Sequence, residues 1–217
     1  MGIFFIMVKA FISYSSKNIV FAKRLKEFLD AIEIESFLAD DDIRIAEDWK
    51  ERILNELNTC QIIIPILSKD FKNSDWCSQE IGIFYFLKKI IIPISVDGTR
   101  SYGFIGHIQS KSIGSDITPE LLVAEGLGKC YNYKPLIYLL KKAGSFRYSE
   151  NIFKVLEQYF DKLNKDDVNI ILDISIKNGQ IWSAAECADR YLPNLLAMRK
   201  DVIEHDLMEK IMSKIKQ

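Results

Sequence analysis

Two residues at helical spacing, Trp76 and Glu80, carry the clearest chemical signal in this sequence. They follow the apolar run of residues 60–67 and lie at the start of a helix predicted for residues 75–88. Residues i and i+4 share one face of a helix, so the ring and the carboxylate point the same way. In open α/β sheets, ligands bind just beyond the carboxyl ends of the strands. The pair therefore indicates a ligand site, although an arbitrary WxxxE pattern is more often a packed tryptophan beside an ordinary exposed glutamate.

The chemistry open to Glu80 is limited by its being a single acid. Hydrolysis of ordinary glycosides usually takes two carboxyl groups. One carboxylate is sufficient where the leaving group departs without being protonated, and the N-glycosidic bond to a cationic nicotinamide is of this kind. Glu80 is thus suited to the cleavage of such a bond.

Two loops add polar groups near the same predicted site. The loop of residues 13–18 is rich in hydroxyls before a helix and suits a phosphate, while capping of that helix by Ser16 or Asn18 is the simpler interpretation. The loop that begins with three aspartates, residues 40–42, lacks the alternating ligands and the glycine of a metal loop. A hydrated surface loop is favoured there, and Ile43 and Ile45 within it indicate contact with a partner.

Short apolar runs alternate with helical patterns in the first half of the chain. Strands are predicted over residues 8–14, 35–39, 61–67 and 90–96, with a last short strand within 105–113. Apolar residues at helical spacing predict helices over residues 19–32, 47–57 and 75–88. This alternation predicts an α/β fold, and the near-continuously apolar strands predict a parallel sheet covered on both faces.

From about residue 118 the pattern becomes helical only. Six helices are expected, over residues 121–127, 134–142, 149–163, 166–177, 183–191 and 195–215. No repeat period is visible, so packed helical hairpins are the expected arrangement. We therefore expect two domains, residues 1–117 and 118–217.

Composition excludes several classes of protein. Lys and Arg number 29 against 30 Asp and Glu, so there is no basic field for nucleic acid. Neither the two histidines nor the four cysteines have the spacing of a metal site or a disulfide framework. Reduced thiols, and an apolar N-terminus without the charge of a signal peptide or the length of a membrane span, predict a cytoplasmic protein without a membrane partner. Met7 is an alternative to Met1 as the start.

Four segments, in order, resemble those of a Toll/interleukin-1 receptor (TIR) domain of the bacterial kind. Residues 10–16 look like the family's first box, and residues 37–43 look like its second strand with the assembly loop. Residues 68–81 look like the segment of the catalytic glutamate, and residues 102–105 with Gln109 look like the late box. The resemblance covers about residues 7–115. Many members carry an acid near the position of Asn18 or a histidine near that of Asp40, and this chain has neither.

The resemblance implies a flavodoxin-like α/β fold with a five-stranded parallel sheet in the order 2-1-3-4-5. A C-terminal all-helical extension follows it. The switch point of such a sheet, between strands one and three, coincides with residues 13–16 and with the Trp76/Glu80 face. Two independent interpretations therefore place the site at the same end of the sheet.

The resemblance also implies an activity and its residues. It implies an NAD+ nucleosidase or cyclase that releases nicotinamide and yields ADP-ribose or a cyclic isomer, with NAD as substrate and no cofactor or metal. Glu80 is then catalytic, holding the nicotinamide-ribose hydroxyls and stabilising an oxocarbenium-like charge. The implied substrate-binding residues are Tyr14, Ser15, Ser16, Phe37, Asp41, Ile43 and Trp76. Asp41 and Ile43 belong to a loop that often completes the site across a subunit contact.

The size of the chain and its helical tail resemble the sensor half of a Thoeris-like antiphage system. Such a sensor makes a nucleotide messenger for a separate effector protein and associates with itself through the TIR domain. A non-enzymatic TIR interaction module is the alternative, because the scaffold branch of the family lacks catalysis. A secreted effector that depletes host NAD is a third option. The product, the trigger, the oligomeric state and the role of the tail stay open at this point.

Overall fold

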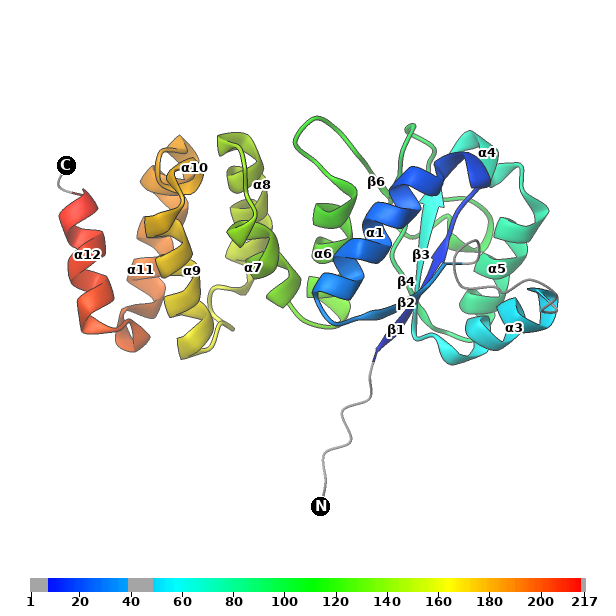
Figure 1. The fold of residues 1–217 in the computed structure, drawn as a ribbon, viewed down its shortest axis with the longest axis horizontal. Helices are drawn as coiled ribbons and strands as arrows, with labels where there is room; N and C mark the ends of the chain where they lie inside the picture. The colour runs from blue at the N-terminus through cyan, green and yellow to red at the C-terminus, as the bar shows by residue number, and fades with distance from the viewer. Residues whose placement is uncertain (1–7, 39–48, 216–217) are drawn as a thin grey trace, which may run out of the picture. The chain divides into compact units, whose positions relative to one another are not determined.

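The computed structural model describes residues 8–38 and 49–215 of the 217-residue chain (Figure 1). The chain divides into two compact units, Met1–Gly126 and Leu127–Gln217. The division falls within helix α6, Pro119–Cys130. The domain boundary expected after residue 117 stays a prediction.

A parallel sheet forms the centre of the first unit. Its strands, among the described residues, are β1 Lys9–Ser13, β2 Glu35–Phe37, β3 Ile62–Leu67, β4 Ile90–Ile91, β5 Ile94–Ser95 and β6 Lys111–Ser112. β1 lies between β2 and β3, and β3 pairs with both β4 and β5 before β5 pairs with β6. The parallel α/β fold predicted from the sequence is confirmed.

The order of the sheet differs from the predicted 2-1-3-4-5 only where the fourth strand is divided. Residues 90–96 were expected as one strand, but β4 and β5 are separate and both lie beside β3. Pro93 stands between them, and proline has no N–H to donate to a ladder. The interruption therefore has a local cause, and the sequence of neighbours across the sheet is kept.

Helices cover both faces of this sheet. Besides α6, they are α1 Ile19–Ala31, α3 Trp49–Thr59, α4 Lys69–Lys72 and α5 Asp75–Phe86, with short 3-10 turns η1 Ser16–Asn18 and η2 Gly103–Ile105. Figure 1 shows α1 and α6 on one side of the sheet and α3 and α5 on the other. On the α1–α6 side, Arg24 donates to both carboxylate oxygens of Glu120 at 3.0 and 3.1 Å.

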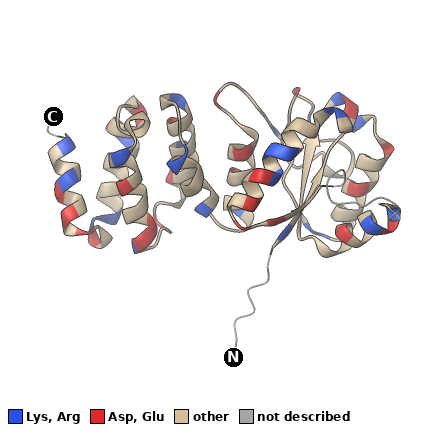
Figure 2. Cartoon of the chain, in the orientation of Figure 1, with Lys and Arg blue, Asp and Glu red and all other residues tan. Residues whose placement is uncertain are grey.

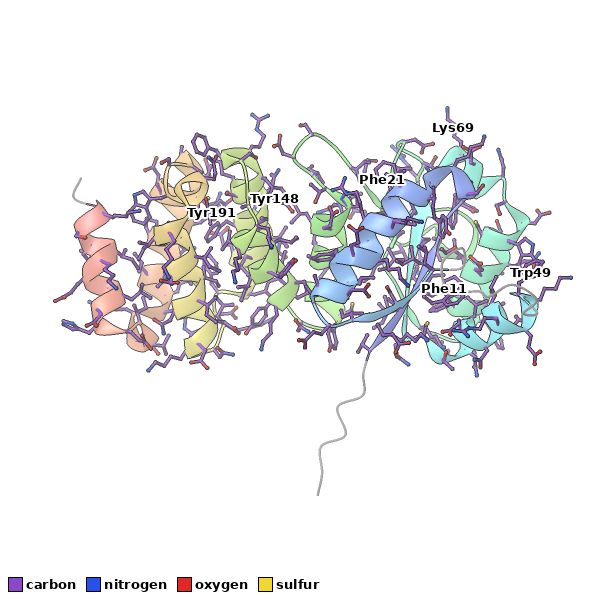
Figure 3. The ribbon with its side chains drawn as sticks, viewed as in Figure 1. Phe11, Phe21, Trp49, Lys69, Tyr148 and Tyr191 are labelled. Atoms are coloured by element: carbon purple, nitrogen blue, oxygen red, sulfur yellow. The ribbon has the colours of Figure 1, made fainter. Side chains whose placement is uncertain are left out.

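Two clusters of apolar side chains fill the side of the sheet that α3 and α5 cover. The first joins α3 and α5 to β1, β2 and β3 through Phe11, Phe37, Ile53, Leu57, Cys60, Ile63 and Phe84. The second joins the end of β3 to α4, α5 and η2 through Leu67, Phe71, Cys77, Ile81 and Ile105. Phe11 lies inside the unit in Figure 3, and its ring centroid is 5.3 Å from that of Phe37. These clusters fix α5 against the end of β3, which is the element that carries the candidate site.

The second unit consists of helices, so the predicted helical extension is confirmed. After α6 come α7 Lys134–Lys141, α8 Phe146–Leu156, α9 Lys165–Lys177, α10 Gly179–Trp182, α11 Leu192–Arg199 and α12 His205–Ile215, with short turns η3 Glu157–Tyr159, η4 Cys187–Tyr191 and η5 Lys200–Val202. α8 packs against η4 through Phe153 and Tyr191, whose rings stack at 5.8 Å (Figure 3 labels Tyr191).

The helix predicted over residues 195–215 is wrong in one respect, because it is broken between α11 and α12. The side chain of Asn169 on α9 binds the backbone at the break. It donates to the Val202 carbonyl at 3.1 Å and accepts from the Glu204 N–H at 3.0 Å. A side chain distant in sequence thus satisfies backbone groups that a continuous helix would have paired internally.

The described residues carry mixed charges and no helix that could cross a membrane. Figure 2 shows basic and acidic positions interleaved along the helices of each unit. None of the helices in the described part of the chain is long and apolar enough for a span.

Candidate active site

The candidate site lies where β1 and β3, two neighbouring strands, reach their carboxyl ends. β1 ends at Ser13, which is in register with Pro65 of β3. After β3 the chain turns through α4 into α5. The hydroxyl of Ser74 caps α5 by accepting from the Cys77 N–H at 3.3 Å. The cap places Trp76 and Glu80 in the first two turns of this helix.

Glu80 is buried and hydrogen-bonded across the sheet end. Its side chain accepts through Oε2 from the hydroxyl of Ser13. Glu80 is 8% exposed and Ser13 is 1% exposed. The expectation of an ordinary exposed helix glutamate is therefore wrong, because α5 turns this face toward the end of β1.

Burial changes the acidity of this carboxyl. It raises the pKa of Glu80 to about 7, while the hydrogen bond from Ser13 lowers the pKa and offsets part of the effect. Burial also raises the pKa of the neighbouring Cys77 thiol to about 11. At neutral pH the site thus holds an acid poised between its two protonation states beside a neutral thiol.

Trp76 lies beside a second indole that the sequence did not associate with it. The rings of Trp76 and Trp49 meet edge to face, with centroids 4.7 Å apart. They are 38% and 42% exposed, so both keep part of their faces at the surface. Trp49 is the first residue of α3, and this position brings it beside Trp76 (Figure 3 labels Trp49).

The loop after β1 reaches the start of α5 through its backbone. The Tyr14 carbonyl accepts from the Cys77 thiol at 3.5 Å. Tyr14 and Ser15 are half-buried and Ser16 is exposed. Tyr14 therefore lies next to the start of α5, and Ser15 and Ser16 follow it in the chain.

The predicted capping by Ser16 or Asn18 is wrong. Ser16 lies within η1, and Asn18, at the position before α1, makes no side-chain cap. Asn18 instead accepts through Oδ1 from the Ser68 hydroxyl at 2.8 Å. Its side chain thus joins the loops after β1 and β3, because those strands are neighbours.

One other predicted site residue in the described part of the chain, Phe37, is not brought to this surface. Phe37 is 1% exposed and belongs to the first apolar cluster, so its ring has no face left to line a cleft. The family resemblance implied that Phe37 binds substrate, but its side chain points to the core. Asp41 and Ile43 lie outside the described residues.

A cavity lies against another face of α5. It has a volume of about 1080 Å³, and its lining includes Gln79, Ile83 and Phe86 of α5 with Phe104 and His107. Glu80, Ser13 and Trp76 are not part of its lining. This cavity is therefore not the ligand site predicted beside Glu80, because residues 79, 83 and 86 lie on another face of the helix.

Sequence reasoning placed Ser13 at the switch point but assigned it no role. Its hydroxyl is nonetheless the group that holds Glu80. The signal available was its place as the last residue of a buried strand at the switch point, where a polar residue needs a partner. Within the described residues, no group of three or more His, Cys, Asp or Glu side chains suits a metal ion.

Comparison with known proteins identifies the family. A family model described as a TIR domain matches residues 10–118, which is half of the chain. This chain belongs to the TIR domain family. The family includes enzymes that cleave NAD and members without enzymatic activity, and TIR domains associate with one another in signalling.

A solved TIR domain is also similar to this chain in fold. It comes from the Toll-related receptor TRR-2 of the lower metazoan Hydra magnipapillata, with 21% sequence identity and a TM-score of 0.43. The match covers 48% of this chain and 82% of that one. No curated protein matches the sequence.

Proposed function

We propose that this TIR protein cleaves NAD+ at its nicotinamide N-glycosidic bond, with Glu80 as the catalytic residue. The observation that supports this most is the buried Glu80 carboxyl at the switch point of the sheet, held by Ser13 one helical turn from Trp76. A buried acid with a strongly raised pKa at the carboxyl end of parallel strands is typical of a functional site.

The chemistry required of Glu80 is electrostatic. As the bond between the ribose C1′ and the nicotinamide nitrogen breaks, its electron pair passes to the ring nitrogen and the ring leaves as neutral nicotinamide. The sugar becomes oxocarbenium-like, and an ionised Glu80 stabilises it while accepting hydrogen bonds from the ribose hydroxyls. A well-aimed group of this kind contributes about 2.7–4 kcal/mol to the transition state.

Other residues of the site bind the rest of the substrate in this proposal. Trp76 stacks on the nicotinamide side, where its indole is partly exposed. Tyr14, Ser15 and Ser16 line the approach from the loop after β1, and Asp41 and Ile43 complete it from a second copy of the chain. Water then attacks C1′ and loses a proton to give ADP-ribose, or a nucleophile within the same ADP-ribosyl group attacks C1′ to give a cyclic isomer.

The biological role that we propose is a signal in antiphage defence. The ADP-ribose product or its cyclic isomer is the messenger, and a separate effector protein receives it. The TIR domain associates with itself in the active state, in the cytoplasm, without nucleic acid or a membrane.

The test is direct measurement of nicotinamide release. The full-length protein is incubated with NAD, and the small molecules are identified by mass spectrometry. Glu80→Gln should lower the rate by about 10²–10³, because a neutral amide cannot stabilise the charge. Glu27→Gln, the same change on the exposed face of α1, should keep the wild-type rate. Equal rates in wild type and Glu80→Gln would contradict the assignment of Glu80.

One observation favours the non-enzymatic TIR scaffold as a second candidate. Glu80 is 8% exposed, and a scaffold needs no access to it. Measurement of nicotinamide release from assembled protein distinguishes the two candidates. Absence of nicotinamide release under conditions where the protein has associated would favour the scaffold.

A further inference from the structure

Ser13 stands at a point where its side chain has little freedom to move. It is the last residue of β1, a strand that pairs with β2 on one side and β3 on the other. It is 1% exposed, so neighbouring atoms enclose the hydroxyl. That hydroxyl donates to Oε2 of Glu80, which is 67 residues away in the sequence.

We propose that Ser13 is a positioning residue of this site: its hydroxyl holds Oε2 of Glu80 and leaves Oε1 to receive the ribose hydroxyls. The assignment rests on the proposed function for its role in catalysis. The holding of Glu80 itself can be measured whether or not NAD is cleaved.

The physical reason is the cost of a buried charge. An ionised carboxylate out of water needs hydrogen-bond donors, and a donor that is already in place costs nothing to reorganise during the reaction. Among the causes that act on the acidity of Glu80, the bond from Ser13 is the one that favours the charged form. Without it, burial acts alone and the carboxyl keeps its proton to higher pH.

The titratable groups around the pair do not replace this donor. On α5, the Cys77 thiol interacts with both Ser13 and Glu80, but its raised pKa of about 11 keeps it neutral while Glu80 titrates. Tyr14 follows Ser13 in the chain. The Lys17 ammonium is largely exposed and is paired with Asp70 at 2.9 Å. Neither the Cys77 thiol nor the Lys17 ammonium therefore takes the place of the Ser13 hydroxyl on the Glu80 carboxylate.

The experiment compares variants of Ser13 with a matched buried serine. Ser13→Ala removes the donor, Ser13→Cys keeps the volume but donates only weakly, and Ser13→Thr keeps the hydroxyl. Ser95→Ala is the control, because Ser95 is also 1% exposed at the end of a strand but its hydroxyl has no hydrogen-bond partner among the described residues. The carboxyl carbon of Glu80 is titrated by ¹³C NMR in each protein, with Glu80→Gln used for assignment, and NAD cleavage is followed over the same pH range.

In Ser13→Ala the titration midpoint of Glu80 should rise by about one to two pH units. This is the effect expected when a charged group loses one hydrogen bond. Ser13→Cys should change it in the same direction, while Ser13→Thr and Ser95→Ala stay near wild type. The acidic limb of the rate profile should move with the midpoint, and kcat should fall more than KM rises. A purely structural role would lower activity without moving either midpoint.

The outcomes separate this inference from the proposed function. An unchanged Glu80 midpoint in both Ser13→Ala and Ser13→Cys overturns the inference, whatever the activity. Absence of NAD cleavage by the wild-type protein overturns the proposed function, and the NMR titration then decides alone whether Ser13 holds Glu80. If Ser13→Ala fails to fold, Ser13→Cys supplies the comparison.

Discussion

Glu80 is the residue at which the energetics of the fold and the proposed chemistry meet. Replacing an ordinary glutamate on a helix surface changes the free energy of unfolding little. Here the side chain is enclosed, and it accepts a hydrogen bond from Ser13, the last residue of a strand on the other side of the site. Its removal therefore affects stability as well as activity, and replacement by the isosteric glutamine is a better test than truncation to alanine.

The raised pKa of Glu80 predicts how stability changes with pH. The unfolded carboxyl has an ordinary pKa near 4.5 and the folded one about 7, so the folded protein binds more protons between these values. The free energy of unfolding should thus fall as pH rises from about 4.5 to 7, by on the order of 3 kcal/mol from this group. Glu80→Gln should lack this component. The measurement is urea unfolding of both proteins at pH 5 and pH 8.

The prediction fixes the direction in which the free energy of unfolding changes with pH, so a contrary result is easy to recognise. Wild type should lose stability relative to Glu80→Gln on going from pH 5 to pH 8. A parallel pH dependence in the two proteins would mean that Glu80 has an ordinary pKa and is solvated in solution.

At the scale of elements, α5 is the part of the fold that presents the site. The same short helix contributes Cys77 and Ile81 to the core, Trp76 to the surface and Glu80 to the end of β1. These residues point in different directions because the helix turns 100° per residue. The register of α5 at its N-terminus therefore decides whether Glu80 meets Ser13.

The capping of α5 by Ser74 yields a prediction about this register. Ser74→Ala should lower the free energy of unfolding by about 1 kcal/mol, because an N–H of the first turn loses its acceptor. Ser74→Asp should retain most of the stability, since aspartate caps as well as serine. The midpoint of urea unfolding measures both. Equal stability of the alanine and aspartate variants would show that the cap contributes little.

For the whole molecule, α6 is the element that the two compact units share along the chain. Gly126 closes against Ile92 so tightly that a Cβ would overlap the isoleucine side chain. Within the first unit, Glu125 is also buried and pairs with Lys111 at 2.6 Å. In the second unit, a Cβ on Gly128 would lie 2.8 Å from the hydroxyl of Tyr159. At both positions a neighbouring side chain comes so close to the helix backbone that glycine is required.

This packing predicts opposite effects for one substitution at two helical glycines. Gly126→Ala should lower the stability of the first unit by about 1–3 kcal/mol, because the core must move to admit a methyl group. Gly82→Ala on α5 meets nothing within 4 Å and should raise stability by up to about 1 kcal/mol through helix propensity. Calorimetry of the full chain measures both, and a stabilising Gly126→Ala would contradict the close packing of α6.

The sequence alone was sufficient for features that depend on local periodicity. The alternation of apolar runs with helical patterns predicted the parallel α/β fold, and the spacing of Trp76 and Glu80 predicted that they share one face of a helix. These features depend on residues within a few positions of one another, where the geometry of a helix or strand is known in advance.

The tertiary structure alone decided which distant groups meet. Ser13 reaches Glu80 across 67 positions, Asn18 turns to Ser68 instead of capping a helix, Trp49 lies beside Trp76, and Phe37 belongs to the core. Each of these outcomes depends on which strands are neighbours and on how much of a side chain they enclose. Burial is a property of the packed molecule, and it is burial that turns Glu80 from an ordinary surface acid into one with a pKa of about 7.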